Sequence, residues 1–152
     1  MKPRFNLAAN PEPYRALAGV EAYLKKSGLE PGLLHMLKLR ASQMNGCAYC
    51  LDMHWKDAKA AGESDQRLYG LPAWEESPYY SDRERAALAW TQAITDLHDG
   101  HVSDAVYDAA RAHFNEAELP ALTWAAAVIN TWNRLAIASR AEPGQYKPGM
   151  HG

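Results

Sequence analysis

Residues 31–61 read PGLLHMLKLRASQMNGCAYCLDMHWKDAKAA and predict two helices joined by a tight turn. Pro31 suits the first turn of a helix, and apolar side chains recur at helical spacing from there to Met44. Gly46 ends this helix, because glycine readily takes the left-handed conformation that commonly closes one. The second helix starts with CAYCLDMH, residues 47–54. The bend of this hairpin therefore carries both cysteines of the chain.

The motif at the bend predicts thiol chemistry. Positions i, i+3 and i+7 share one face of a helix, so Cys47, Cys50 and His54 form a single stripe. A cysteine in the first helical turn meets the positive end of the helix dipole, which favours the thiolate. Two cysteines one turn apart also lie within the Cα separation that a disulfide requires. We expect a dithiol that opens and closes, with His54 accepting the proton of Cys50 or stabilising its thiolate.

Length and charge restrict the possible functions. The 152 residues suit one domain, and a net charge of −2 with scattered basic residues argues against nucleic-acid binding. No apolar stretch reaches the roughly 18 residues of a membrane span, and the N-terminus lacks the apolar run of a signal peptide. Two cysteines spaced C-x-x-C do not make the disulfide framework of a secreted protein. These features predict a soluble, cytoplasmic protein without nucleic-acid or membrane partners.

The composition predicts an all-α fold. Val and Ile together number only seven, no segment alternates long enough for a strand, and Ala, Leu, Glu, Lys and Arg dominate. About six to seven helices are expected, over residues 13–26, 31–44, 47–61, a short stretch after Ser64, 81–97, 103–114 and 115–140. Residues 1–152 then form a single domain, with an arm at 1–12, a helical core at 13–140, and a tail at 141–152 that is mobile or lies over a neighbour.

A second proton carrier is expected in the first helix of the hairpin. When two helices pack about a tight turn, residues equally far from the bend face each other. Lys38 then lies opposite His54, and His35 lies about one turn further from the bend, within reach of His54 directly or through a water. His35 is therefore a candidate for proton transfer, and a polar residue at the rim of the hairpin is the alternative.

The run LLHMLKLRASQMNGCAYCLDMH, residues 33–54, resembles the core of the alkyl hydroperoxidase D-like proteins in the carboxymuconolactone decarboxylase superfamily. The segments ERAALAW at 84–90 and INTWNRLA at 129–136 resemble that group too, so the resemblance covers roughly residues 13–140. It implies an all-α bundle of the alkyl hydroperoxidase D-like type, assembled into trimers or hexamers. It also implies a peroxidase that acts on hydroperoxides without haem, flavin or metal.

The resemblance also implies a role for each motif residue. The cysteine matching Cys50 attacks the peroxide and becomes a sulfenic acid, and the one matching Cys47 resolves it as a disulfide, which a thiol or dithiol reductant reopens. The histidine matching His54 belongs to the proton relay. Where the best-known members have a relay glutamate this chain has His35, and where they carry a histidine between the cysteines it has Tyr49.

Glu84 is a candidate for the missing relay carboxylate. Its spacing from Ser81 equally fits a capping box, in which Glu84 would close the start of its own helix. Two other functions also fit the motif. Cys47, Cys50, His54 and His35 could bind zinc, or the dithiol could belong to a non-enzymatic redox sensor or interaction protein. Lactone decarboxylation ranks below these, because the members with that activity do not rely on a C-x-x-C pair.

The remaining polar and aromatic residues have simpler interpretations. Four histidines lack partners at motif spacing and are expected to be solvated or capping residues: His98, His101, His113 and His151. The five tryptophans suit the core or a contact between subunits, which favours a homo-oligomer. Asn130, Asn133 and Arg134 either hold the last helix against the active helix or contact a neighbouring subunit.

Overall fold

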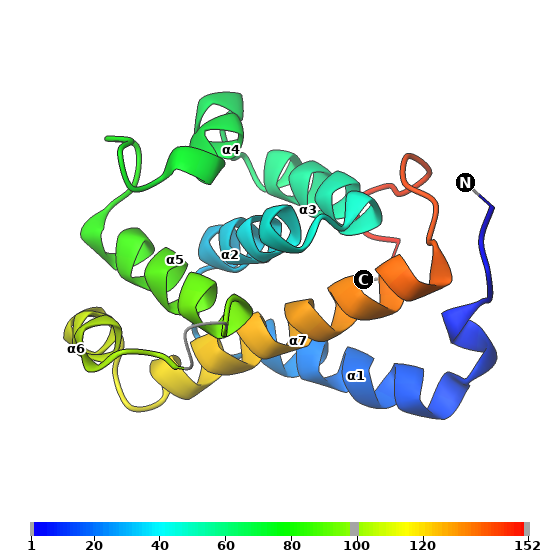
Figure 1. Cartoon of the computed structure of the whole chain (residues 1–152), viewed down its shortest axis with the longest axis horizontal. Coiled ribbons are helices and arrows are strands. Elements are labelled where there is room, and N and C mark those ends of the chain that lie inside the picture. The colour runs from blue at the N-terminus through cyan, green and yellow to red at the C-terminus, as the bar shows by residue number, and fades with distance from the viewer. Residues whose placement is uncertain (1, 98–100, 151–152) are drawn as a thin grey trace.

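The computed structural model describes residues 2–97 and 101–150, and over these residues the protein is helical throughout (Figure 1). Its elements are the 3₁₀ helix η1 (Leu7–Ala9), α1 (Pro11–Leu24), α2 (Pro31–Asn45), α3 (Ala48–Ala60), α4 (Asp65–Gly70), the 3₁₀ helix η2 (Leu71–Ala73), α5 (Asp82–Thr95), α6 (Asp104–His113) and α7 (Glu118–Ser139). The predicted all-α bundle is confirmed. His98 and His151 lie outside the described residues.

Helix α2 lies at the centre of the bundle, where it packs against α3, α5 and α7 (Figure 1). α7 also packs along α1, and α6 covers α5. One buried cluster joins α1, α2, α5, α6 and α7 through side chains such as Leu37, Phe114 and Leu122. A second joins α2, α3, α4 and α5 through Leu68 and Leu88. Each fully buried leucine contributes roughly 1.5–3 kcal/mol to the free energy of unfolding. These clusters therefore hold α2 and α3 in a fixed relative orientation.

The bend between α2 and α3 depends on one glycine. Gly46 has φ 67°, and its N–H bonds to the carbonyls of Gln43 and Ser42, which closes α2. Cys47 follows directly as the N-cap of α3, and its Sγ accepts the backbone N–H of Cys50 at 3.4 Å. A side chain at position 46 would strain this left-handed conformation. The tight turn therefore places both cysteines at the N-terminus of α3.

A polar network ties α7 to this bend. Asn133 is completely buried and donates through Nδ2 to Ser42 Oγ at 3.0 Å. The amide of Asn45 donates to Asn130 Oδ1 at 2.9 Å and to Asn133 Oδ1 at 2.8 Å. Arg134 donates to Asn130 within α7. The sequence left open whether these residues hold α7 in place or contact a neighbouring subunit. In the structure Asn130 and Asn133 hold α7 in place, and they do so against the end of α2 rather than against α3.

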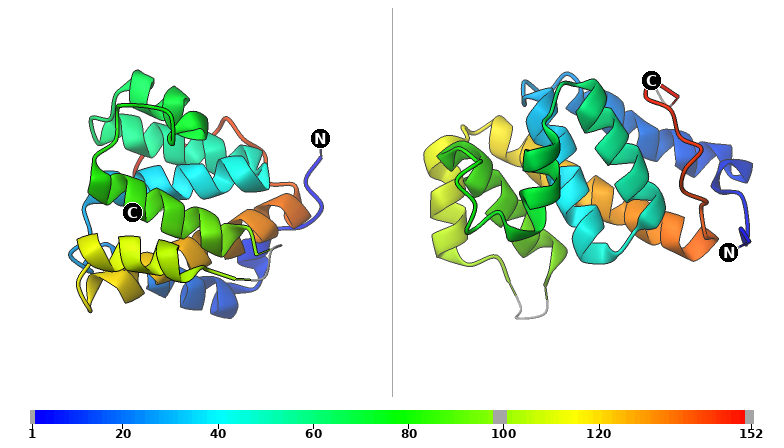
Figure 2. Two further views of the ribbon diagram at one scale, coloured as in Figure 1. Left: turned by 60° about the vertical axis from the view of Figure 1, so that its left-hand side comes forward. Right: turned by 90° about the horizontal axis from the view of Figure 1, so that it is seen from above.

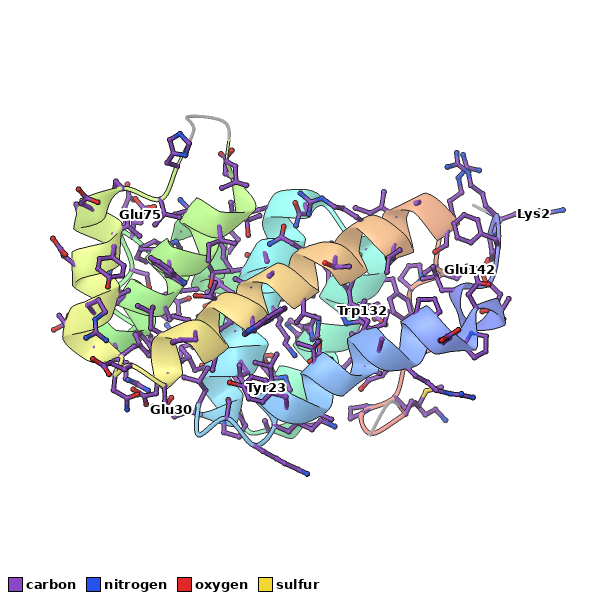
Figure 3. The ribbon with its side chains drawn as sticks, turned by 90° about the horizontal axis from the view of Figure 1, so that it is seen from below. Lys2, Tyr23, Glu30, Glu75, Trp132 and Glu142 are labelled. Atoms are coloured by element: carbon purple, nitrogen blue, oxygen red, sulfur yellow. A yellow bond between two sulfur atoms is a disulfide. The ribbon has the colours of Figure 1, made fainter. Side chains whose placement is uncertain are left out.

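The two ends of the chain lie together at one end of the molecule. Figure 3 shows Lys2 of the N-terminal arm and Glu142 of the C-terminal tail at the same end. The arm meets the C-terminal end of α7, where the backbone N–H of Arg4 donates to the carbonyl of Ser139 at 2.8 Å. The right-hand view of Figure 2 shows the tail running between α3 and the arm. Both segments therefore lie over the end of the bundle that carries the cysteines.

The tail, residues 141–150 as described, packs on its own chain. Lys56 of α3 donates to the carbonyl of Tyr146 at 3.1 Å, and the buried Tyr146 donates its hydroxyl to Asp57 Oδ1 at 2.7 Å. Over residues 141–150 these contacts correct the expectation of a mobile tail, whereas its contact with a neighbour stays a prediction. Composition could not reveal these hydrogen bonds, because they join residues about ninety positions apart.

Candidate active site

The two cysteines form a disulfide at the N-terminus of α3. Cys47 and Cys50 have a Cα–Cα separation of 5.3 Å, and each is 1% exposed. They pack against Ala136 of α7, with Tyr49 beside them. Cys50 lines a large cavity, whereas Cys47 is not among the residues of its wall. The pair is therefore close enough to open and close without a large movement of the backbone.

The cavity beside Cys50 has a volume of about 1150 Å³. Its wall is built by the N-terminal arm, α1, α2, α3, the end of α7 and the tail. Aromatic rings form part of this wall: Trp132, labelled in Figure 3, lies between α7 and α1 and meets Tyr14 edge to face, with ring centroids 5.4 Å apart. The polar side chains of the wall include His35 and His54. One cysteine and two histidines therefore line the same cavity.

His54 lies one turn after Cys50 and is 6% exposed. Neither ring nitrogen has a hydrogen-bond partner among the described residues. Burial is the main reason that the pKa of His54 lies well below its usual value, and the positive charge of Lys38 and the neighbouring His35 lower it further. The imidazole is therefore neutral at neutral pH, the state in which it can accept a proton.

His35 and Asp57 complete a compact group around His54. One ligand atom of each residue lies within 4.8 Å of the others, with His35 on α2 and the other two on α3. Burial lowers the pKa of His35, and Lys38 adds to this effect, while Asp57 opposes it. The structure thus brings together the two histidines that the sequence singled out. Asp57 was not expected in this group, although its i+3 spacing from His54 places both on one helix face.

An ion pair between Lys38 of α2 and Glu21 of α1 lies in the same wall. Lys38 was expected opposite His54, and its charge does act on that imidazole. The partner, Glu21, was missed because it lies on another helix with no motif around it. This ion pair supplies the cavity with a second carboxylate next to the histidines.

The structure does not bring Glu84 to this group. Glu84 lies in the first turn of α5, where it forms a capping box with Ser81 and an ion pair with Arg67. Burial would raise the pKa of its carboxyl, but hydrogen bonds from Arg67 and from the backbone of Ser81 outweigh burial and lower it. Glu84 is not among the residues that line the cavity. The capping alternative is the one that the structure supports.

No helix in the described part of the chain has the length and apolar character needed to cross a membrane. Within the same residues, the group that could hold a metal is His35, His54 and Asp57. It shares both histidines with the zinc site considered from the sequence, but neither cysteine. The cysteine sulfurs are bonded to each other instead.

A family model of carboxymuconolactone decarboxylases matches residues 11–93. Protein YdfG of Bacillus subtilis, which is uncharacterized, is 41% identical over 128 residues, or 84% of this chain and 87% of YdfG. A crystal structure of a protein of unknown function from Agrobacterium tumefaciens, suggested to be the antioxidant defence protein AhpD, is also 41% identical. It has a TM-score of 0.91 and covers 95% of this chain and 100% of its own.

A more distant solved structure shares the fold. It is the alkylhydroperoxidase AhpD core of an uncharacterized peroxidase-related protein from Ralstonia eutropha, with a TM-score of 0.80 at 22% identity. The match covers 91% of this chain and 74% of that protein. The described helices, the position of the C-x-x-C pair and these similarities agree with one another. The chain belongs to the carboxymuconolactone decarboxylase family and has the AhpD-like fold.

Proposed function

We propose that the protein is a thiol-dependent peroxidase that reduces hydrogen peroxide or small organic hydroperoxides without haem, flavin or metal. The observation that carries this proposal is the position of Cys50, which lines the large cavity together with His54 and His35. The suggested antioxidant role of the Agrobacterium relative supports the same reaction class. The cycle has two chemical steps on the protein and one reduction.

In the first step, neutral His54 accepts the thiol proton of reduced Cys50. The thiolate sulfur attacks one peroxide oxygen, the O–O bond breaks, and the leaving oxygen takes the proton back from the imidazolium. The products are an alcohol, or water from hydrogen peroxide, and a sulfenic acid on Cys50. The position of Cys47 as N-cap leaves Cys50 in the first turn of α3, where the helix dipole favours its thiolate.

In the second step, Cys47 attacks the sulfur of the Cys50 sulfenic acid. The S–S bond forms while hydroxide leaves, and that hydroxide takes up the proton of the Cys47 thiol to become water. An external dithiol then supplies two electrons and two protons, which restores both thiols and leaves the reductant as a disulfide. The 5.3 Å Cα separation allows both states on the same backbone.

His35 passes protons between His54 and the cavity. It is half-buried whereas His54 is buried, and the two imidazoles lie in the same compact group. An imidazole can accept a proton on one nitrogen and release one from the other, so two in series can carry a proton outward. His35 in this role occupies the position at which the best-known alkyl hydroperoxidase D-like proteins have a glutamate.

The reductant must reach sulfurs that are almost completely buried. A small peroxide can use the cavity, but a dithiol reductant needs a wider path to Cys50. The arm and the tail form part of the cavity wall, and hydrogen bonds with Asp52, Lys56 and Asp57 attach the tail to α3. We therefore expect the reductant to enter where the tail separates from α3.

The test is steady-state turnover of a hydroperoxide with dithiothreitol as reductant. Wild-type protein is expected to turn over many times per chain, and Cys50→Ser to have no activity above the uncatalysed rate. Cys47→Ser is the matched variant, because it keeps the attacking sulfur. It should consume one peroxide and then hold a sulfenic acid that dimedone traps.

Two results would contradict the proposal. Wild-type activity in Cys50→Ser would show that another group attacks the peroxide. Oxidation of the dithiol once per chain, without continued turnover in the presence of reductant, would favour the redox sensor instead.

Self-association is part of the proposal. Several large apolar side chains are exposed on the described surface, including Trp55, Tyr107, Trp124 and Ile137. Burying such residues between subunits would favour association, and we expect a trimer or hexamer. Light scattering after gel filtration measures the assembled mass directly, and a monomer at micromolar concentration would contradict this part.

A further inference from the structure

We propose that His35, His54 and Asp57 form a binding site for a divalent transition metal ion, and that zinc matches this donor set best. One ligand atom of each side chain lies within 4.8 Å of the others. Over residues 2–97 and 101–150, this is the group of histidine, cysteine and acidic side chains with that geometry. Imidazole nitrogen and carboxylate oxygen are both common zinc ligands.

The backbone arrangement suits a metal site. His54 and Asp57 lie one turn apart on α3, and His35 reaches them from α2, which packs against α3. Ligands from two helices can surround an ion, whereas one regular helix constrains tetrahedral closure. Bonds of about 2.0–2.1 Å place tetrahedral ligand atoms about 3.3 Å apart, so atoms now within 4.8 Å need to approach by about 1.5 Å at most. Rotations of the half-buried His35 and Asp57 side chains can supply this movement.

His54 provides an independent observation in favour of a ligand. Its side chain is 6% exposed and lines the cavity, and neither ring nitrogen has a hydrogen-bond partner among the described residues. A buried polar group without a partner is costly, and coordination would satisfy one nitrogen. Burial also keeps both imidazoles in the neutral form that binds metals, because it lowers the pKa of His35 and of His54.

The carboxylate already has the support that metal ligands usually have. Asp57 Oδ1 accepts the hydroxyl proton of Tyr146 at 2.7 Å. That bond orients the carboxylate, whose remaining lone pairs can serve an ion. Tyr146 belongs to the tail, so the segment that covers the cavity would also stabilise the site.

The charges around the site differ between its two histidines: carboxylates act on His35, whereas Lys38 opposes a positive charge at His54. The groups that act on His35 are the carboxylates of Asp57 and Glu21 and the ammonium of Lys38. Lys38 is paired with Glu21, which offsets its repulsion of a metal ion. Two carboxylates and one ammonium sum to one negative charge, which a divalent ion would overcompensate by only one unit.

No cysteine takes part in this site. Cys47 and Cys50 are bonded to each other, so the oxidised protein should bind metal through nitrogen and oxygen alone. A bound ion would occupy the imidazole lone pairs that the proposed peroxidase uses for proton transfer. To the extent that the proposed function holds, zinc therefore inhibits turnover, while the binding itself does not depend on that function.

The experiment is a metal titration of the metal-free, oxidised full chain. Zn²⁺ binding is measured by calorimetry, and Co²⁺ binding by visible absorption. We expect one ion per chain, with the d–d bands of four-coordinate cobalt and no sulfur-to-cobalt charge-transfer band. His35→Ala and Asp57→Asn should each weaken binding by about tenfold or more. In the wild-type protein, zinc should shift the imidazole ¹⁵N resonances of His35 and His54 but not that of His113.

Two controls isolate the site. His113→Ala removes an exposed histidine at the end of α6 and should leave the affinity unchanged. The Cys47→Ser/Cys50→Ser double variant should still bind Co²⁺. Wild-type affinity in folded His35→Ala and Asp57→Asn, unshifted His35 and His54 resonances, or loss of binding in the double cysteine variant would each overturn the proposal. Binding without turnover, or turnover without binding, separates this inference from the peroxidase assignment.

Discussion

The start of α5 and the wall of the cavity both contain partly buried ionisable side chains, but the two regions differ in whether these side chains have hydrogen-bond or ion-pair partners. At α5, Glu84 is paired with Arg67, and Arg83 is paired with both Glu30 and Glu118. In the cavity, the nitrogens of His54 have no hydrogen-bond partner among the described residues, and burial keeps the ring neutral.

The difference separates groups that stabilise the fold from groups that can react. Pairing with an opposite charge stabilises the ionised form of a carboxyl group. Hydrogen bonds from Arg67 and Arg83 therefore lower the pKa values of Glu84 and Glu118. A buried neutral imidazole with free nitrogens can take up a proton, or an ion, when the chemistry brings one. The same comparison explains why Glu84, a plausible relay residue in sequence, serves a structural purpose.

Apart from the loss of Cys50 itself, the largest effect is expected at His54. Replacing it in His54→Gln removes the group that accepts the Cys50 proton, and the turnover rate should fall by roughly 100- to 10,000-fold. Stopped-flow measurement of Cys50 oxidation by hydroperoxide tests this step separately from reduction. His113→Gln serves as the matched control on an exposed histidine. A loss below about tenfold would place proton transfer elsewhere.

Glu84 should show the opposite behaviour. Glu84→Gln loses the ion pair with Arg67 and weakens the capping box, which should lower the free energy of unfolding by about 1–2 kcal/mol. Turnover by the folded protein should stay at the wild-type value. Urea denaturation and the peroxidase assay measure the two quantities, with exposed Glu116→Gln as control. A strong loss of turnover in the folded variant would show that Glu84 takes part in proton transfer.

The depressed pKa of His54 predicts how stability changes with pH. The unfolded histidine takes up a proton near its ordinary value of 6.5, whereas the folded one resists protonation until the pH is much lower. Below about pH 6.5 the unfolded state thus binds more protons, and this contribution to stability is lost as the pH falls through that range. Urea unfolding between about pH 7.5 and 5.5 measures the effect. The loss should be smaller in His54→Gln, and an equal loss in both proteins would refute this attribution.

The smallest effect is expected at the tail. Lys56→Ala removes hydrogen bonds to the carbonyls of Gly144 and Tyr146, so the tail should separate from α3 more often. Reduction of the disulfide by dithiothreitol should become roughly two- to tenfold faster. Lys59→Ala is the matched control, because Lys59 pairs with Asp65, away from the tail. Equal reduction rates for the wild type and Lys56→Ala would show that the reductant enters by another path.

Much of the fold was predictable because its signals are local. Pro31 at the start of α2, Gly46 at its end and the capping box of Ser81 and Glu84 all act within one or two helical turns. The observed helices lie within a few residues of the predicted ones for the same reason. The tail was the exception, because its hydrogen bonds to Lys56 and Asp57 come from a helix far away in sequence.

The helices follow from local signals in the sequence, and so does the placement of Cys50 and His54 one turn apart on the same face of α3. Cys47 lies just outside the predicted stripe, because it precedes α3 as an extended N-cap residue. The sequence also indicated His35, because a tight turn makes the two helices of a hairpin face each other. Three features come from the packing of the whole chain: Cys50 lines the cavity, Asp57 joins the histidines, and Glu84 stays at α5. These outcomes depend on how α1, α7 and the tail pack around α2 and α3, and such packing joins residues that no local pattern relates.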